Sequence, residues 1–165
     1  MADTYYPIQK GNFWKYNLKT GGSFTNEITE CGADYYIATC STGNQTSKVK
    51  LENGTHFSDS FEAGNFQPTF IDNSKVGDTW EIKYKANGID SILKMNVIEI
   101  AASKEIEGKV FNDVMLIEGE SVFSMNGNII PSGMKTQYYY AKNIGAVLTT
   151  SSLGDYMPIV EYQIN

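Results

Sequence analysis

The stretch Trp14-Lys15-Tyr16-Asn17-Leu18-Lys19 decides the fold, because apolar and polar side chains alternate through it without a break. The stretch Trp80-Glu81-Ile82-Lys83-Tyr84-Lys85 repeats the alternation later in the chain. A period of two predicts antiparallel strands with one buried and one wet face. Turn pairs such as Asn53-Gly54, Asn87-Gly88 and Asn126-Gly127 divide the chain into about ten short strands. The pattern predicts an all-β fold, either a single antiparallel barrel or a curved half-barrel sheet, with a β-sandwich as the alternative.

The length of 165 residues suits one domain, and no linker or low-complexity tract divides it. We therefore expect a single β domain over residues 1–165. No apolar run approaches the roughly 20 residues that span a bilayer as a helix, so no membrane span is expected.

The segment between Ile92 and Val110 carries the strongest irregularity of the pattern. Leu93, Met95 and Val97 share one face of a strand over residues 92–101, but Ile98 and Ile100 follow on the other face. This switch predicts a β-bulge or a segment covered on both sides. Residues 101–110 lack a helical stripe and contain a glycine, so we expect a turn at Ser103-Lys104-Glu105 instead of a helix.

The charge pattern excludes several classes of partner and cofactor. The formal net charge is −6, and all thirteen basic residues are lysines. Without arginine and with an acidic balance, the chain is a poor match for nucleic acid. One histidine and two cysteines cannot complete a structural zinc site or ligate an iron–sulfur cluster, so no metal and no cofactor are expected.

The cysteines and the first residues leave two questions open. Cys31 and Cys40 either form a disulfide, which would need a wide loop between them, or remain free thiols. The start Met1-Ala2-Asp3-Thr4 shows no secretory leader. The protein is then either cytoplasmic or a mature exported form whose leader was replaced by methionine.

A short internal repeat accompanies both tryptophans. Gly11-Asn12-Phe13-Trp14 and Gly77-Asp78-Thr79-Trp80 each place a glycine three residues before an indole that enters an alternating strand. The repeat is interpreted either as one way of starting a strand used twice or as the trace of a duplicated half-domain.

The opening Tyr5-Tyr6-Pro7-Ile8-Gln9-Lys10-Gly11-Asn12-Phe13-Trp14-Lys15-Tyr16 resembles the Tyr-[Phe/Tyr]-Pro-Leu-x-x-Gly-x-x-Trp-x-Tyr start of a family of uncharacterised bacterial exported proteins and lipoproteins. Residues 75–80, 108–114 and 139–147 fit the same pattern in order. The resemblance implies an antiparallel β domain in the periplasm, attached to the outer membrane or outside the cell, and it transfers no catalytic residue. A cytoplasmic location is the alternative.

One polar cluster could carry catalysis. His56, Ser58, Ser60 and Glu62 would share one face of a strand, opposite Phe57 and Phe61. A serine nucleophile needs a base in contact and an acid that orients the base, but Glu62 lies about 20 Å from His56 along an extended strand. We therefore interpret the cluster as a solvated strand face and expect no catalytic residue. We interpret Glu118 and Glu120 as acidic surface residues and not as a catalytic pair of carboxylates.

Aromatic residues supply the remaining candidate site. Tyr138 and Tyr140 share one strand face, and together with Trp14 and Trp80 they are the predicted ligand-binding residues. The sequence thus predicts a non-enzymatic protein that holds a small apolar ligand in a curved sheet. Two alternatives stay open: a module that binds a glycan or a protein through exposed aromatics, and a hydrolase centred on His56. The oligomeric state is not predicted.

Overall fold

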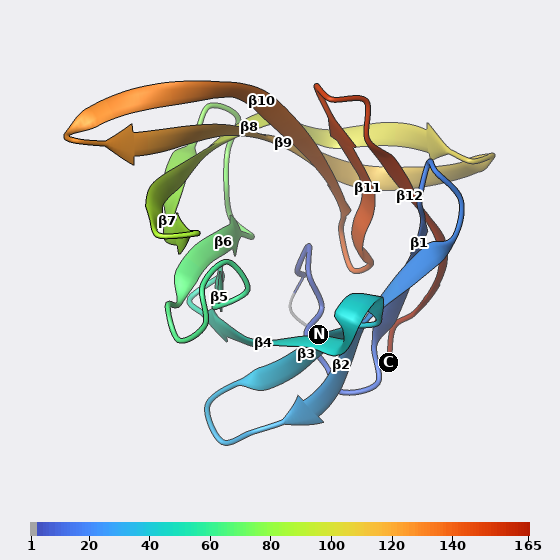
Figure 1. Cartoon of the computed structure of the whole chain (residues 1–165). Helices are drawn as coiled ribbons and strands as arrows, with labels where there is room; N and C mark the ends of the chain where they lie inside the picture. The colour runs from blue at the N-terminus through green and yellow to red at the C-terminus, as the bar shows by residue number, and fades with distance from the viewer. Residues whose placement is uncertain (1–2) are drawn as a thin grey trace.

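The computed structural model describes residues 3–165, which form one twelve-stranded antiparallel sheet curled into a nearly closed barrel (Figure 1). The predicted all-β barrel is confirmed. Within residues 3–165 the helical content is one 3₁₀ turn, η1 (Thr42–Asn44), and no helix is long and apolar enough to cross a bilayer. The strands are β1 (Phe13–Asn17), β2 (Ser23–Cys31), β3 (Tyr36–Cys40), β4 (Gln45–Glu52), β5 (Thr55–Ser58), β6 (Gln67–Ile71), β7 (Thr79–Ala86), β8 (Ile89–Ile106), β9 (Lys109–Met125), β10 (Asn128–Ala141), β11 (Gly145–Ser151) and β12 (Tyr156–Gln163).

Two six-stranded meanders build the barrel. The strand order is β6-β5-β4-β3-β2-β1-β12-β11-β10-β9-β8-β7, so β1–β6 and β7–β12 each pair only with chain neighbours, except where β1 meets β12. The β1–β12 ladder is antiparallel and aligns Trp14 with Tyr162. The free edges of the sheet, β6 and β7, face each other on the opposite side, where no ladder joins them.

The predicted Asn-Gly turns close three hairpins. Asn53, Asn87 and Asn126 have φ angles of 49°, 51° and 51°, and the glycine after each is also at positive φ. Two successive positive φ angles define the type I′ turn, whose twist matches that of the flanking strands. The β8–β9 turn at Glu107-Gly108 adopts the same conformation without an asparagine, which explains why the sequence pattern did not reveal it.

The strand β8 is longer and more irregular than predicted. The turn expected at Ser103-Lys104-Glu105 is wrong, because β8 continues through these residues and pairs with β9 up to Ile106. The expected bulge is confirmed: the β8–β9 register shifts at three places between Val97 and Lys104, and Ala101 has a φ of 58°. The extra residues let β8 bend, and the β8–β9 turn lies after the last residue of the strand, Ile106.

The two Gly-x-x-Trp segments start the two meanders in the same way. Gly11 and Gly77 have φ angles of 90° and 92°, and the residue after each donates its N–H to the carbonyl three positions earlier at 3.0 Å. Gly11 N–H donates to Ile28 O at 2.8 Å, and Gly77 N–H donates to Val97 O at 2.9 Å. The same turn and the same hairpin register therefore open β1 and β7, as expected both for a strand start used twice and for a duplicated half-domain.

The interior holds two apolar clusters, each built from residues of both meanders, and the N-terminal segment packs against both. Trp14 and Ile28 belong to the first cluster, and Ile82 and Val97 to the second. Tyr5 packs in the second cluster and Tyr6 against the first, and Figure 1 shows this segment inside the ring of strands. Of the two alternatives for the cysteines, the structure has free thiols at both positions.

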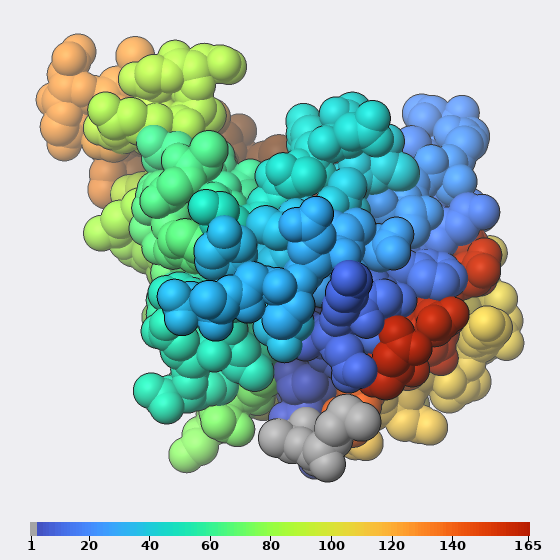
Figure 2. Space-filling model, turned by 90° about the horizontal axis from the view of Figure 1, so that it is seen from below, coloured from blue at the N-terminus to red at the C-terminus, as the bar shows by residue number. Residues whose placement is uncertain are grey.

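The ends of two hairpins project from the barrel wall. Figure 2 shows the β7–β8 turn near residue 88 and the β9–β10 turn near residue 127 standing out together at one corner. Ile89, Met125, Ile129 and Ile130 are exposed on this projection.

Candidate functional site

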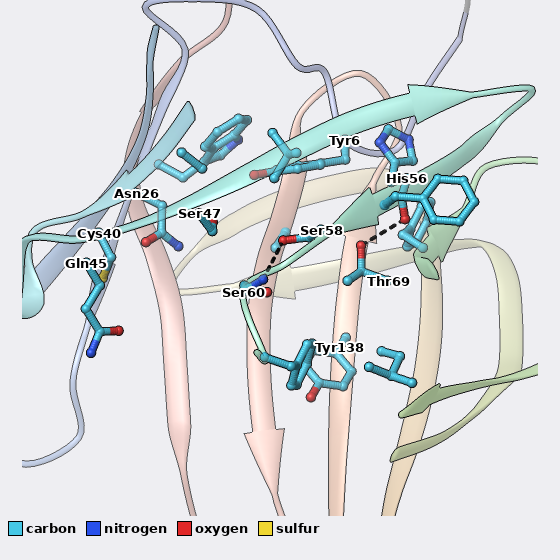
Figure 3. A pocket seen from close by; sticks show the side chains of 18 of the residues that line it. Tyr6, Asn26, Cys40, Gln45, Ser47, His56, Ser58, Ser60, Thr69 and Tyr138 are labelled. Atoms are coloured by element: carbon cyan, nitrogen blue, oxygen red, sulfur yellow. Dashed lines mark hydrogen bonds between the residues drawn. The ribbon is translucent and has the colours of Figure 1, made fainter. Parts of the chain in front are cut away.

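A cavity of about 330 Å³ lies inside the barrel. Its volume is at the lower end of the range of small-molecule sites, roughly 300–1,000 Å³. Neither aspartate nor glutamate nor lysine lines it within residues 3–165. Figure 3 shows Asn26, Cys40 and Gln45 at one end of the cavity and Tyr6 and His56 toward the other. The apolar walls include Trp14, Val49, Phe70, Ile82, Leu93 and Met95.

Aromatic rings in tilted and edge-on contact form the inner end of the cavity. The ring centroids of Tyr6 and Trp14 are 5.2 Å apart, those of Tyr6 and His56 5.7 Å, and those of Phe70 and Tyr140 4.5 Å. Such distances are typical of favourable aromatic pairs, which hold each ring in one orientation. This end of the cavity is therefore preorganised.

A buried hydrogen-bonded pair, His56 and Asp72, fastens the N-terminal segment beside the cavity. His56 Nε2 lies 2.9 Å from Asp72 Oδ2, and the two side chains are 1% and 7% exposed. The Thr4 hydroxyl donates to both carboxylate oxygens of Asp72, at 3.0 and 2.9 Å, and the Tyr5 N–H donates to Oδ1 at 2.8 Å. Because an ionised carboxylate only accepts, His56 Nε2 donates to Asp72. Asp72 thus links His56 on β5 to Thr4 and Tyr5 of the N-terminal segment, which lies inside the barrel.

These contacts set the ionisation of Asp72. Burial alone would raise the pKa of its carboxyl, but the hydrogen bond from His56 and the N–H of Tyr5 outweigh burial, and the pKa lies below its usual value. Asp72 is the member of the site that sequence reasoning missed. No local sequence pattern joins Asp72 to a histidine 16 residues earlier.

The predicted solvated face at His56 is wrong. His56 and Ser58 are buried on β5 and line the cavity, whereas Phe61 is exposed and Ser60 and Glu62 lie beyond the end of the strand. Ser58 Oγ accepts the N–H of Ser60 at 3.1 Å. His56 Nδ1 is buried and has no hydrogen-bond partner within residues 3–165. The His56–Asp72 pair therefore resembles a base and its orienting acid with no nucleophile at the free ring nitrogen.

Burial keeps the interior tyrosines protonated. It raises the pKa of Tyr6 to about 12 and also raises the pKa values of Tyr16 and Tyr140. The Tyr16 hydroxyl donates to Ala146 O at 2.7 Å. The Tyr6 and Tyr140 rings keep some accessible surface because they face the cavity. These phenols act there as neutral hydrogen-bonding groups.

Three of the four predicted ligand-binding residues meet at the cavity. Trp14, Tyr138 and Tyr140 line it, although the Trp14 indole N–H already donates to Ile144 O at 2.6 Å. Trp80 does not line the cavity; it borders a second pocket of about 600 Å³, together with Glu118 and Glu120. Whether any of these residues binds a ligand remains a prediction.

Side chains close the barrel between β6 and β7. Gln67 Oε1 accepts the N–H of Lys83 at 2.9 Å, Asn65 Nδ2 donates to Lys83 O at 3.0 Å, and Glu62 Oε1 accepts the N–H of Lys85 at 3.1 Å. The hydrogen bond from Asn65, followed by that from the Lys85 backbone, lowers the pKa of the Glu62 carboxyl. We call these five residues the seam.

Comparison with known proteins identifies the fold. No protein-family model matches the chain, and no curated protein matches it. It is similar to a "putative exported protein with YmcC-like fold" from Bacteroides fragilis, with a TM-score of 0.60 and 13% identity over 98% of this chain and 100% of that chain. It is also similar to a "putative lipoprotein" from Parabacteroides distasonis, with a TM-score of 0.53 and 14% identity over 99% and 100% of the two chains. At these identities the likeness establishes a shared barrel fold.

Proposed function

We propose that this protein is a non-enzymatic protein of the cell envelope or the exterior that holds a small ligand inside its barrel. The cavity between the two meanders carries the proposal, because it is preformed and aromatic at its inner end. The inward position of Tyr138 and Tyr140 favours this function over a module with an exposed aromatic face.

The polar residues beneath the cavity support a non-catalytic function. The hydrogen-bonding groups of Thr4 and Asp72 are engaged with each other, with His56 and with the backbone of Tyr5. No hydroxyl of residues 3–165 bonds to His56 Nδ1, where a nucleophile would be needed. We assign this network to holding the N-terminal segment in the barrel.

The location rests on the resemblance of the opening motif and on the two structural neighbours, which are described as exported and as a lipoprotein. Fractionation of cells that make the natural protein tests it. We expect recovery in the envelope or the medium, and recovery in the cytoplasm would contradict the proposal.

The free thiols provide the test of ligand binding. Cys40 lines the cavity and Cys31 is exposed outside it. The reactivity of Cys40 therefore reports on the cavity, and that of Cys31 is the reference within the same molecule. We expect 1-naphthylamine, a neutral fluorescent compound, to increase its emission on mixing with the folded protein and to slow the reaction of N-ethylmaleimide with Cys40 but not with Cys31.

A matched pair of variants on β4 localises the binding. Ser47 points into the cavity, and its hydroxyl makes no hydrogen bond within residues 3–165, whereas Lys48 is exposed on the other face of the strand. Ser47→Phe should abolish the uptake of 1-naphthylamine, and Lys48→Phe should leave it unchanged. Equal uptake by both variants would contradict binding in the cavity.

A further inference from the structure

Two phenolic hydroxyls at the inner end of the cavity lack a protein partner. The Tyr16 hydroxyl is committed to Ala146 O, but the hydroxyls of Tyr6 and Tyr140 make no hydrogen bond within residues 3–165. Figure 3 shows the Tyr6 ring lying across the cavity with its hydroxyl directed away from His56. Both residues line the cavity, so their hydroxyls can donate to a polar atom supplied from outside the chain.

Packing fixes both rings before any ligand arrives. Tyr6 lies against Trp14 and His56, and Tyr140 lies against Phe70 with centroids 4.5 Å apart. The His56 ring, which lies against Tyr6, also lies 5.7 Å from the Phe70 ring, which lies against Tyr140, so the two phenols belong to one aromatic group. An oxygen atom inserted between Tyr6 and Tyr140 would receive two hydrogen bonds at little conformational cost.

The remaining walls restrict the charge and the size of a ligand. Among residues 3–165 no acidic or lysine side chain lines the cavity to balance a charge, and the burial of an unpaired charge is strongly unfavourable. Ile82, Leu93 and Met95 present an apolar side wall. At roughly 30 Å³ for each water in the liquid, the cavity has the capacity of about eleven waters, which suits a ligand of roughly ten to fifteen non-hydrogen atoms.

We infer that the cavity takes an uncharged, mainly apolar ring compound whose single hydroxyl or carbonyl oxygen is hydrogen-bonded by Tyr6 and Tyr140. This inference rests on the proposed function and adds to it the chemical class of the ligand and the two residues that recognise its oxygen.

Four probes separate the inferred class from its competitors. Each is tested for displacement of 1-naphthylamine from the folded protein at pH 7: 2-naphthol carries a ring and one hydroxyl, naphthalene the ring alone, 2-naphthoate a charge, and methyl β-glucopyranoside many hydroxyls. Because two hydrogen bonds contribute about 1 kcal/mol each or less, we expect 2-naphthol to bind about tenfold more tightly than naphthalene. Binding of the charged probe and of the sugar should be weaker still.

Removal of one hydroxyl tests the assigned residues. Tyr140→Phe keeps the ring and should reduce the preference for 2-naphthol over naphthalene to about threefold, since one of two hydrogen bonds is lost. Tyr6→Phe should act in the same way. Tyr139→Phe is the matched control, because Tyr139 is the strand neighbour of Tyr140 and does not line the cavity. Urea unfolding of each variant verifies that the fold persists.

The outcomes distinguish the two proposals. If 1-naphthylamine binds but 2-naphthoate or the glucoside displaces it best, the inferred class is wrong and cavity binding stands. Equal affinities for 2-naphthol and naphthalene, or a preference that survives both tyrosine substitutions, would also overturn the inference. If the folded protein takes up no probe at all, the proposed function fails and the inference fails with it.

Discussion

Gly145 is the residue at which the backbone and the core meet most closely. Its φ is 121°, and a Cβ built there would lie 2.6 Å from Trp14 Nε1. The Trp14 indole cannot retreat without losing its hydrogen bond to Ile144 O. A side chain at position 145 would therefore strain the backbone and displace the largest buried ring.

The first prediction compares two glycines. Gly145→Ala should destabilise the protein by about 3 kcal/mol or more, because backbone strain of roughly 1–2 kcal/mol adds to a steric clash in the core. Gly133→Ala is the control, since Gly133 is also at positive φ but has open space around it. Urea unfolding measures both, and equal losses would contradict the clash.

The second prediction concerns the pH dependence of Asp72. Its folded pKa lies below the unfolded value of about 3.9, so its contribution is complete above that pH and is lost as the pH falls through the lower folded value. Asp72→Asn should cost about 1–3 kcal/mol at pH 7 and flatten the loss of stability below about pH 4. Asp90→Asn, at an exposed position, should do neither. Parallel curves for Asp72→Asn and the unaltered protein would refute the assignment.

The burial of Trp14 could be predicted from the sequence, whereas the burial of His56 could not. The burial of Trp14 follows from its place in an alternating strand and was predicted. The burial of His56 was not, because a neighbouring pair of phenylalanines suggested the opposite face. The side chain that makes the burial of His56 tolerable, Asp72, belongs to another strand end, and its position depends on tertiary structure alone.

At the scale of elements, hairpins were predictable and the seam was not. Asn-Gly pairs determine turn geometry locally, so their positions could be read directly. The seam joins two edges through side chains of Glu62, Asn65 and Gln67, residues that carry no strand or turn signature of this role. An edge strand covered in this way exposes fewer unpaired backbone groups to other chains.

The third prediction tests the seam. Glu62→Ala removes the acceptor of the Lys85 N–H, so this amide should exchange with solvent about tenfold faster, while amides of β7 that pair with β8 keep their rates. Glu81→Ala removes another exposed acidic side chain nearby and is the control. Amide hydrogen exchange measures the effect, and unchanged exchange at Lys85 would show that the seam does not protect the edge.

Because the pKa of the Glu62 carboxyl is lowered, its stabilising effect is present above the usual glutamate value and is lost as the pH falls through the folded value. Exchange of the Lys85 amide in the unaltered protein, corrected for the intrinsic effect of pH, should therefore approach that of Glu62→Ala in acid. A protection factor that stays constant through this range would contradict the role of the carboxylate.

At the scale of the whole molecule, the fourth prediction concerns the tyrosine-lined interior. The folded pKa of Tyr6 is about 12, against about 10 in an unfolded chain, so its stabilisation is complete below pH 10 and is lost as the pH rises toward 12. Phenolate absorbance should rise in two steps, with the exposed tyrosines first and the buried ones together with unfolding. In urea one step near pH 10 is expected. A single step in the folded protein would contradict an enclosed interior.

The overall closure of the barrel was beyond local sequence patterns. Alternation and turns predict which strands are neighbours in the chain, and those pairings are found throughout both meanders. The contact of β1 with β12, by contrast, links residues up to 150 positions apart, as in the pair Phe13 and Gln163. The insertion of the N-terminal segment is equally nonlocal, so the position of the cavity could not be predicted although its existence was proposed.

The single ladder between the meanders has a consequence for folding kinetics. Each meander can form from hairpins that close quickly, whereas β1 and β12 must find each other across most of the chain, at a much larger entropic cost. We therefore expect the docking of the two halves to be the slow step, and the interior cavity to form only after it. A bound guest would accordingly lengthen the lifetime of the native state by slowing its opening, with little effect on the rate at which either half forms.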